Sequence, residues 1–380
     1  MKKLAIIGAS YLQQPLILKA KSMGIQTHVF AWKVGDVGEA SADFFYDISI
    51  IEKEKILDKC MEIGVDGICS IASDLAVVTV NFVAHHMGLV GNSLESTLYS
   101  TNKNMMRKRF EENKVPSPKS ILVEKVEDLD GVSLEYPIIV KPLDRSGSRG
   151  ITKLDDSKGL SNAIEAAKEC GFIKKALVEE FVGGREYSVE SISWKGIHRC
   201  LAITQKYTTG SPHFIETGHL EPAGIEDNLR SKIYSVVTQG LDSLGILYGA
   251  SHSELKIDDD GNIKIIEIGG RMGGDFIGSD LVKLSIGYDF VKAVIDVALG
   301  YEPESYEIYK KKYAAVRFIF NEDDVAIFEK IKSEAPQFLK DYDINYDVEG
   351  EVTDSSNRFG YYIMCGNEMS DIVEYLPSNK

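Results

Sequence analysis

The first hundred residues alternate between strand-like and helix-like segments, and this alternation restricts the possible folds more than any other feature. Short apolar runs such as Lys3–Ile7 are separated by segments whose apolar residues recur every three or four positions, such as Leu12–Met23. Further strands are predicted at Thr27–Trp32 and Gly67–Ile71, and further helices at Glu52–Ile63 and Leu75–Met87. Strands joined through helices by short loops imply βαβ units and a mostly parallel sheet, so we predict a Rossmann-like domain of the α/β class.

The turn after the first strand does not match a dinucleotide-binding fingerprint. That fingerprint needs three glycines in the pattern G-x-G-x-x-G, whereas Gly8–Gln13 contains a single glycine. The acidic residue that binds a ribose hydroxyl is also missing after the second strand, where the sequence is Phe30–Trp32. An NAD-dependent oxidoreductase is therefore disfavoured, and a Rossmann-like scaffold without that cofactor is the better prediction.

The composition of the 380 residues indicates a globular protein of about two or three domains. The formal net charge of −15 argues against general nucleic-acid binding, because such proteins need a positive surface for phosphates. The five cysteines are odd in number and include no C-x-x-C pair, which disfavours a disulfide framework and a zinc site. The apolar run Leu4–Ile7 is too short for a signal peptide and no segment approaches a membrane span, so we expect a cytoplasmic protein without a membrane partner.

Two prolines in Val115–Pro118 mark a boundary in the chain. They end the helix predicted at Lys103–Glu112 and begin a linker or an edge strand. After this point the pattern changes to antiparallel strands with an amphipathic helix at Leu160–Glu169. We therefore predict three parts, residues 1–100, 101–182 and 183–380, of which the catalytic ones are α+β in character.

Two strand-like runs with a turn between them place two glutamates face to face. The runs are residues 250–257 and 262–269, and Asp260-Gly261 between them is a leading signal for a tight hairpin turn. If these two residues form the centre of the turn, the numbers of paired residues add to 521, and Glu254 faces Glu267. Such carboxylates repel unless one is protonated or a cation lies between them, and Mg²⁺ is commonly held in this way. A slip of one residue, or a β-bulge, would break this pairing.

A lysine inside an apolar strand precedes a turn of small residues. Lys141 is the single charge in the strand predicted at Tyr136–Pro142, and its burial is costly without an anionic partner. The turn that follows begins with Ser146, Gly147 and Ser148, whose small side chains allow backbone N–H groups to approach a phosphate chain. The chain has no G-x-x-x-x-G-K-[ST] P-loop. A purely structural turn is the alternative, but the neighbouring lysine points to a phosphate cradle.

Two glycine-containing segments could bind other parts of a ligand. The segment Val178–Tyr187 holds a strand that ends in two glycines, where a backbone edge could pair with a purine ring and Glu186 could accept from ribose hydroxyls. After the second glutamate strand, Gly270 and Gly273 offer backbone N–H groups for a carboxylate, with Arg271 as the counter-charge. An ordinary β-turn is the alternative for the first segment, and a flexible turn for the second.

Polar residues in two other places are candidates for contact with an acceptor substrate. His213, Glu216 and His219 lie between the strands described above and could recognise an amino group or act as a base. A lone histidine is more often a satisfied residue of the core or surface, which is the alternative. Residues at the C-terminal ends of the first-domain strands are expected to line the far side of the same pocket: Tyr11, Trp32, Ser73 and Asp74.

Taken in order, these segments resemble the ATP-grasp superfamily of ligases, and the resemblance covers nearly the whole chain. The matching stretches are Ser100–Lys103, Ile139–Pro142, Ser146–Gly150, Glu179–Val182 with Glu186, Glu254, and Glu267–Arg271. They look closest to the branch that includes biotin carboxylase, the carbamoyl-phosphate synthetase large chain and bacterial L-amino-acid ligases. The resemblance implies a Rossmann-like N-terminal domain followed by an ATP-grasp fold of two α/β subdomains, a small lid in 101–182 and a larger catalytic subdomain in 183–380.

The resemblance also implies roles for single residues. Those that would contact ATP are Lys103, Lys141, Ser146, Gly147, Ser148, Glu179, Glu180, Phe181, Val182 and Glu186. The two lysines would meet the phosphates, the small residues would close as a lid, the glutamate pair would lie by adenine, and Glu186 would bind ribose. Glu254 and Glu267 would hold Mg²⁺, which Mn²⁺ could replace. Arg271 would act with Lys141 in catalysis, at the transferred phosphate or the substrate carboxylate.

The implied reaction is the ligation of a small carboxylate, an amino acid in the main hypothesis, to an amine through an acylphosphate. Where the family often has Glu-x-Asn-x-Arg, this chain has Gly269 in the place of asparagine, so the number of Mg²⁺ ions, one or two, stays open. One alternative is an enzyme that forms carbamoyl- or carboxy-phosphate from bicarbonate. Another is a nucleotide-binding regulatory protein without catalysis. The resemblance also leaves a homodimer open.

Overall fold

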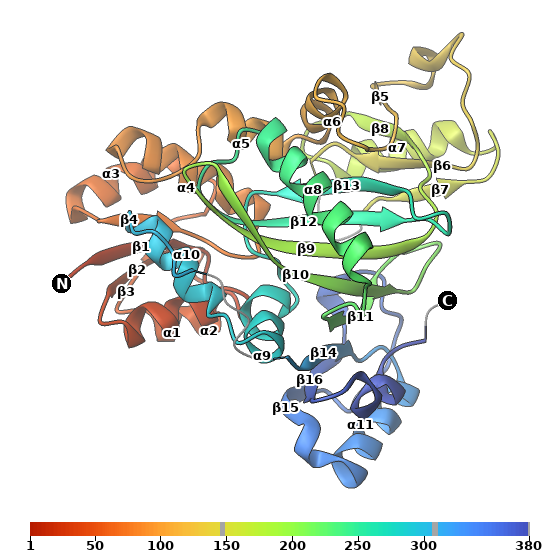
Figure 1. Ribbon diagram of the computed structural model, residues 1–380. Coiled ribbons are helices and arrows are strands. Elements are labelled where there is room, and N and C mark those ends of the chain that lie inside the picture. Colours follow the sequence, from red (N-terminus) through yellow and green to blue (C-terminus); the bar gives the residue numbers. More distant parts are fainter. Residues whose placement is uncertain (145–148, 306–310, 379–380) are drawn as a thin grey trace.

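A computed structural model describes residues 1–144, 149–305 and 311–378, and three β-sheets divide the chain (Figure 1). The first sheet is parallel, with strand order β3-β2-β1-β4, as predicted for a Rossmann-like domain. Its strands are β1 (Lys3–Ile7), β2 (Gln26–Ala31), β3 (Phe44–Asp47) and β4 (Gly67–Cys69). The helices of this region are α1 (Gln14–Ser22), α2 (Val37–Ser41), α3 (Lys53–Ile63), α4 (Asp74–Met87), α5 (Leu94–Thr101) and α6 (Lys103–Glu112).

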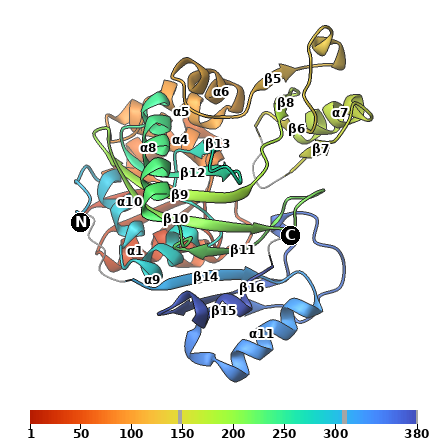
Figure 2. The same cartoon turned by 45° about the vertical axis from the view of Figure 1, so that its right-hand side comes forward.

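The second sheet is small and antiparallel, with strand order β5-β8-β6-β7. Its strands are β5 (Ser120–Val123), β6 (Ile138–Pro142), β7 (Thr152–Leu154) and β8 (Ala176–Glu180). Helix α7 (Leu160–Cys170) covers one face, where Ile164 and Ala167 pack against Val140 and Val178 in a separate apolar core. Figure 2 shows this unit standing apart from the rest of the molecule at the upper right.

The third sheet has eight antiparallel strands in the order β13-β12-β9-β10-β11-β14-β16-β15. They are β9 (Arg185–Trp194), β10 (Ile197–Thr208), β11 (Glu216–Glu221), β12 (Gly249–Ile257), β13 (Ile263–Gly269), β14 (Tyr313–Phe318), β15 (Leu339–Ile344) and β16 (Gly360–Gly366). The helices of this region are α8 (Asp227–Ser243), α9 (Val282–Ser285), α10 (Phe290–Ala298) and α11 (Glu322–Glu334).

Helix α10 fastens the first sheet to the third. Eight of its nine residues are buried, so it is apolar on nearly every side. In one continuous core, Phe290 and Ile295 of α10 pack with Leu4 of the first sheet and Ile192 of the third. The ends of the first-sheet strands are therefore held close to the large sheet, whereas the small sheet has its own core.

The predicted pairing of Glu254 with Glu267 is present, but the turn that was expected to produce it is not. The strands close through Ile257 and Ile263, whose numbers add to 520 rather than 521, around a longer loop with Gly261 at φ +79°. A bulge beyond Leu255 then inserts one extra residue into β13 and restores the pairing of the two glutamates. The expected two-residue turn was wrong, and the expected pair survives because the bulge offsets the change in the loop.

Strand β11 was not predicted from the sequence, although it carries residues of the cavity described below. Its sequence, ETGHLE, has only one large apolar residue, so a pattern of apolar side chains cannot reveal it. Its polar residues His219 and Glu221 are nevertheless buried, and Glu221 accepts hydrogen bonds from the hydroxyls of Thr204 and Ser285 at 2.8 and 2.7 Å. Contacts with neighbouring strands, rather than local propensity, make this segment a strand.

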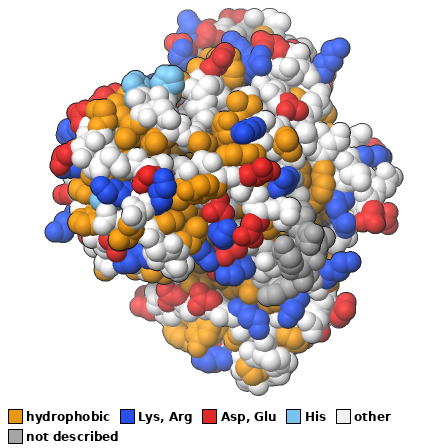
Figure 3. All heavy atoms as spheres, turned by 60° about the vertical axis from the view of Figure 1, so that its left-hand side comes forward, with side chains coloured by type: hydrophobic (Ala, Val, Ile, Leu, Met, Phe, Trp, Pro, Cys, Tyr) orange, Lys and Arg blue, Asp and Glu red, His pale blue; other side chains and the backbone are white. Residues whose placement is uncertain are grey.

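Charges are not gathered by sign on the face of the molecule that Figure 3 shows. On the face in Figure 3, acidic and basic side chains lie intermingled among apolar and uncharged ones. No helix within the described ranges is long and apolar enough to cross a lipid bilayer.

We predict that Gly184 is essential for the connection between the second and third sheets. Its φ is +91°, and a Cβ atom there would lie 2.1 Å from the backbone oxygen of Ile257. Gly184→Ala should therefore lower the free energy of unfolding by about 2 kcal/mol or more, measured by urea denaturation. Gly183→Ala is the matched control, because no atom lies within 4 Å of a Cβ at that position. Equal stability of the two variants would contradict the prediction.

Candidate active site

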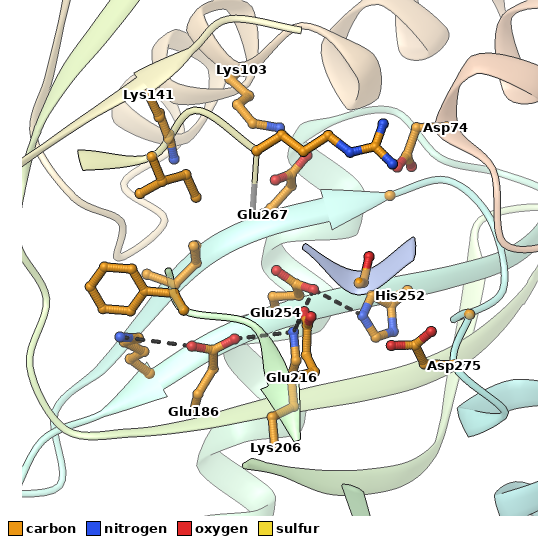
Figure 4. A pocket seen from close by; sticks show the side chains of 18 of the residues that line it. Asp74, Lys103, Lys141, Glu186, Lys206, Glu216, His252, Glu254, Glu267 and Asp275 are labelled. Carbon is orange, nitrogen blue, oxygen red and sulfur yellow. Dashed lines mark hydrogen bonds and ion pairs between the residues drawn. The ribbon is translucent and has the colours of Figure 1, made fainter. Parts of the chain in front are cut away.

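A cavity of about 410 Å³ lies where the three sheets meet, and most of the predicted site residues line it. Asp74 comes from the first domain, Lys141 from the small sheet, and Glu254 with Glu267 from the large sheet (Figure 4). The other predicted residues in its wall are Lys103, Glu179, Glu180, Phe181, Val182, Glu186, Glu216, His219 and Arg271. Ser146, Gly147 and Ser148, predicted as the lid, lie outside the described residues. The remaining wall brings together segments that are far apart in the sequence.

The two facing glutamates each have a lysine of their own. Lys103 at the start of α6 lies 2.6 Å from Glu267, and Lys206 of β10 lies 2.8 Å from Glu254. Burial alone would raise the pKa of Glu254, but Lys206 and His252 hold that pKa well below its ordinary value. Two facing carboxylates need a shared proton or a cation between them. In the structure the two lysines provide the compensation, so no shared proton is needed.

Lys206 forms ion pairs with three carboxylates of the site. Its side chain is 3% exposed, and its ammonium lies 2.8 Å from Glu254, 3.0 Å from Glu186 and 3.5 Å from Glu216. Burial disfavours its charge, but the three carboxylates outweigh burial and keep the pKa of Lys206 well above the ordinary lysine value. Since Lys256 contributes only a more distant contact, 3.7 Å from Glu186, negative charge is in excess beside the glutamate pair.

This donor set fits Mg²⁺. The glutamate oxygens are hard donors, and the excess negative charge around them needs a cation. The described part of the chain contains no group of three or more His, Cys, Asp or Glu side chains placed to hold a metal by themselves. Mg²⁺ does not need such a cage, because it is commonly bound through one or two carboxylates together with substrate phosphates.

Lys141 sits in a buried ion-pair network rather than facing a single anion. Its ammonium lies 2.5 Å from Glu179, and the other oxygen of that carboxylate accepts from Arg107 at 2.9 Å. Burial lowers the pKa of Lys141 despite the neighbouring glutamate. Glu180 in turn pairs with Lys264. Both glutamates predicted to lie by adenine therefore hold cations of this chain, while Phe181 and Val182 line the cavity beside them.

Arg271 is held by the first domain. Its Nε and Nη2 donate to the two oxygens of Asp74 at 2.9 Å each, in a bidentate pair. Of the other first-domain residues expected here, Tyr11, Trp32 and Ser73 are absent from the described wall, where Leu12 and Ala72 stand instead. Asp74 thus brings the first domain to the residue predicted to act in catalysis.

At the end of the cavity that was predicted to bind the acceptor substrate, His219 is buried without a hydrogen-bond partner in the part of the chain that the structure describes. The side chain is 1% exposed, and neither ring nitrogen has a hydrogen-bond partner among the described residues. Asp275 lies 3.8 Å away, too far for a hydrogen bond, and is itself held bidentately by Arg358. Burial lowers the pKa of His219, so its imidazole is neutral near pH 7. Glu216, whose oxygen is 3.5 Å from Lys206, lines the same end.

Three residues predicted for this end do not line the main cavity. His213 is 44% exposed in its side chain and has Glu351 as its nearest anion, 3.9 Å away. Gly273 uses its N–H to donate to Glu190 at 2.9 Å. Gly270 borders a smaller cavity that Arg271 also lines.

Sequence reasoning missed several residues of the site. Lys206 has the same signature as Lys141, a charge near the end of an apolar strand, and the same argument could have found it. His252, Glu190 and Arg358 carry no such mark. His252 contacts Glu190 and lies 3.3 Å from Glu254, and the contact with Glu190 raises the pKa of His252 to about 9 against the effect of burial.

Part of the chain matches a known protein family. Residues 134–280 match the model of the ATP-grasp domain. The chain contains an ATP-grasp domain. The matched region contains β6 through β13, and so includes Lys141, Glu254, Glu267 and Arg271. The predicted resemblance and the predicted fold class are both confirmed.

Similar proteins include several ligases. Alanine–anticapsin ligase from Bacillus subtilis is 26% identical over 326 residues, which are 76% of this chain and 68% of that protein. D-alanine–D-alanine ligase from Hydrogenovibrio crunogenus is 27% identical over 40% of this chain and 50% of that protein. Among solved structures, the L-amino acid ligase from Bacillus licheniformis has a TM-score of 0.83 at 24% identity and covers 99% of this chain and 96% of that chain. This last likeness shows the ATP-grasp fold.

We predict that Lys206 is the main electrostatic support of this ATP-grasp site. Lys206→Met removes the cation shared by three carboxylates and should lower the free energy of unfolding at pH 7 by about 3 kcal/mol or more. Because the pKa of Glu254 is depressed in the folded protein, the stabilisation is present above pH 4.5 and is lost as the pH falls below it. The difference between wild type and variant, measured by urea denaturation, should therefore narrow below pH 4.5.

Lys256→Met is the control for this substitution. Lys256 lines the same cavity but contributes only the 3.7 Å contact with Glu186, so its loss should cost less than about 1 kcal/mol. Equal losses from the two substitutions would show that Lys206 has no special role.

Proposed function

We propose that this protein is an ATP- and Mg²⁺-dependent ligase that joins a small carboxylate, an amino acid in the main hypothesis, to an amine. One observation carries the proposal. Lys103, Lys141 and Arg271 converge from separate segments on one cavity whose floor holds the facing pair Glu254 and Glu267. Phosphoryl transfer needs this kind of charge neutralisation and alignment, and does not need a nucleophile from the protein.

The triphosphate side of the cavity has residues for each part of a nucleotide. We assign Lys103 and Lys141 to the phosphates, because both present ammonium groups to the cavity. Glu254 and Glu267 would hold Mg²⁺, which neutralises phosphate charge during transfer. Phe181 and Val182 would contact adenine, and Glu186 would bind ribose. The predicted lid residues 146–148 join the proposal on their sequence alone.

Residues at the other end of the cavity suit the two remaining substrates. Arg271 would bind the carboxylate that attacks the terminal phosphorus, with the bond to the leaving ADP breaking and an acylphosphate forming. The amine nitrogen then attacks the acyl carbon, the bond to phosphate breaks, and the nitrogen loses a proton. His219 suits that proton because it is buried, neutral and without a hydrogen-bond partner among the described residues. Glu216 would bind the ammonium group of a substrate.

The relatives support this hypothesis over its alternatives. The alanine–anticapsin ligases match 76% of this chain, whereas a carbamoyl phosphate synthase section from Methanopyrus kandleri matches 60% at 23% identity. A nucleotide-binding protein without catalysis would not need a buried neutral histidine beside the reacting end. The ligase hypothesis therefore accounts for both ends of the cavity.

The division of the chain follows the three sheets. We keep the parts 1–100, 101–182 and 183–380 as the proposed domain limits, supported by sheets that occupy residues 3–69, 120–180 and 185–366. Homodimer formation and a cytoplasmic location also stay predictions.

We predict that Glu267→Gln abolishes ATP turnover while the protein keeps its fold. The amide retains the shape of the side chain but removes the charge that would hold Mg²⁺ and that now pairs with Lys103. Steady-state ADP formation should fall by at least about a hundredfold. Circular dichroism should be unchanged, and Asp260→Asn, on the exposed loop of the same hairpin, should keep wild-type turnover. Wild-type turnover in Glu267→Gln would refute the metal assignment.

The substrate class is tested by release of ADP with paired substrates. A panel of amino acids and other small carboxylates is offered together with amines, and each compound is also offered alone. We expect ADP to form only when a carboxylate and an amine are present together. ADP formation with bicarbonate and ammonia would instead favour the carbamoyl-phosphate alternative, and ATP binding without turnover would favour the regulatory one.

A further inference from the structure

Gly269 stands where a related motif often has asparagine, and the structure gives a spatial reason for it. The residue lacks the positive φ that would call for glycine, so backbone conformation does not explain it. Space does: a Cβ atom at this position would lie 2.8 Å from Oδ1 of Asp74 and 3.2 Å from Nε of Arg271. Any side chain at position 269 would therefore push against this ion pair.

The ion pair fixes the direction of the Arg271 guanidinium. Two parallel bonds of 2.9 Å to Asp74 set both the plane and the position of the group, and Nη1 lies 3.4 Å from the backbone oxygen of Met272. Burial opposes ionisation of Asp74, but Arg271 outweighs it and lowers the pKa of that carboxyl. Arg271 therefore takes its orientation from a residue of another domain.

Asp74 is itself fixed in place. It is the first residue of α4, whose N-cap Ser73 accepts a hydrogen bond from the N–H of Ala76. Just before it, Ala72 has φ +59° and donates its N–H to the oxygen of Met272 at 3.1 Å. A Cβ at Gly274 would lie 3.3 Å from that of Ala72, so a second glycine permits the close approach. The segments 72–74 and 269–274 form one tight seam.

We propose that Asp74 is a positioning residue for Arg271, and that Gly269 is kept without a side chain so that this pairing can form. The first domain would then take part in catalysis by orienting the arginine that meets the transferred phosphoryl group and the substrate carboxylate. This inference rests on the proposed function, which gives Arg271 that task.

An ion pair that merely joins two domains is the competing explanation, and the chain offers a matched example. Lys19 of α1 lies 2.7 Å from Asp289, which precedes α10, and neither residue lines the main cavity. Lys19→Ala therefore breaks a contact between the first domain and the rest of the chain without touching the seam. It serves as the control for domain attachment.

The test measures binding of Mg·ADP with and without aluminium fluoride, which imitates the transferred phosphoryl group. Calorimetry is run on wild type, Asp74→Ala, Asp74→Asn, Gly269→Ala, the Asp74→Ala/Gly269→Ala double variant and Lys19→Ala. We expect aluminium fluoride to tighten Mg·ADP binding in wild type and in Lys19→Ala. In Asp74→Ala and in Gly269→Ala, the increase in Mg·ADP affinity that aluminium fluoride causes should be smaller than in wild type by about tenfold or more. The affinity of both variants for Mg·ADP alone should stay within about threefold of wild type. Asp74→Asn should lie between wild type and Asp74→Ala.

The double variant separates the proposal from two independent defects. Once Asp74 is absent, a methyl group at position 269 has no carboxylate to displace, so the double variant should be no worse than Asp74→Ala. The proposal would be overturned if aluminium fluoride tightened Mg·ADP binding in both single variants as much as in wild type. It would also be overturned if the losses multiplied in the double variant, or if Lys19→Ala showed an equal loss. If the wild-type protein did not bind Mg·ADP, the proposed function itself would be refuted. If it bound Mg·ADP but aluminium fluoride did not tighten that binding, this inference alone would be refuted.

Discussion

The compensation of partly buried carboxylates by buried cations is the constraint on which the rest of this structure depends. Glu254 and Glu267 face each other across a hairpin, and each forms an ion pair with a buried lysine, Glu254 with Lys206 and Glu267 with Lys103. The lysines come from strands and helices that are distant in sequence. The cavity can form only when these elements are assembled, so the ion pairs of the cavity depend on the complete fold.

The same constraint explains why the site uses three parts of the chain. The small sheet supplies Lys141 with Glu179, the large sheet supplies the glutamate pair, and the first domain supplies Asp74 to Arg271. The small sheet has its own core, whereas α10 fixes the first domain to the large sheet. The glutamate pair and Arg271 thus belong to the part of the molecule in which the first domain and the large sheet share a core, and a nucleotide would lie between that part and the small sheet.

The sequence predicted the fold and the pairs that depend on local pattern, but not those that depend on assembly. The βαβ order and Lys141 follow from apolar periodicity and the cost of burying a charge. The glutamate pair was also found, although a bulge after Leu255 had to offset an unexpected loop. Strand β11 and the Asp74 partner of Arg271 could not be found, because polar residues buried by tertiary contacts leave no periodic mark in the sequence.

The central claim is that the cavity is completed by Mg²⁺ together with ATP, and calorimetric titration of the wild-type protein with ATP tests it most directly. The titration is made once with Mg²⁺ and once with a chelator and no divalent cation. Excess negative charge beside Glu254 predicts that ATP alone binds at least about tenfold more weakly than Mg·ATP. Equal affinity under the two conditions would contradict the account, because the lysines would then suffice to hold the triphosphate.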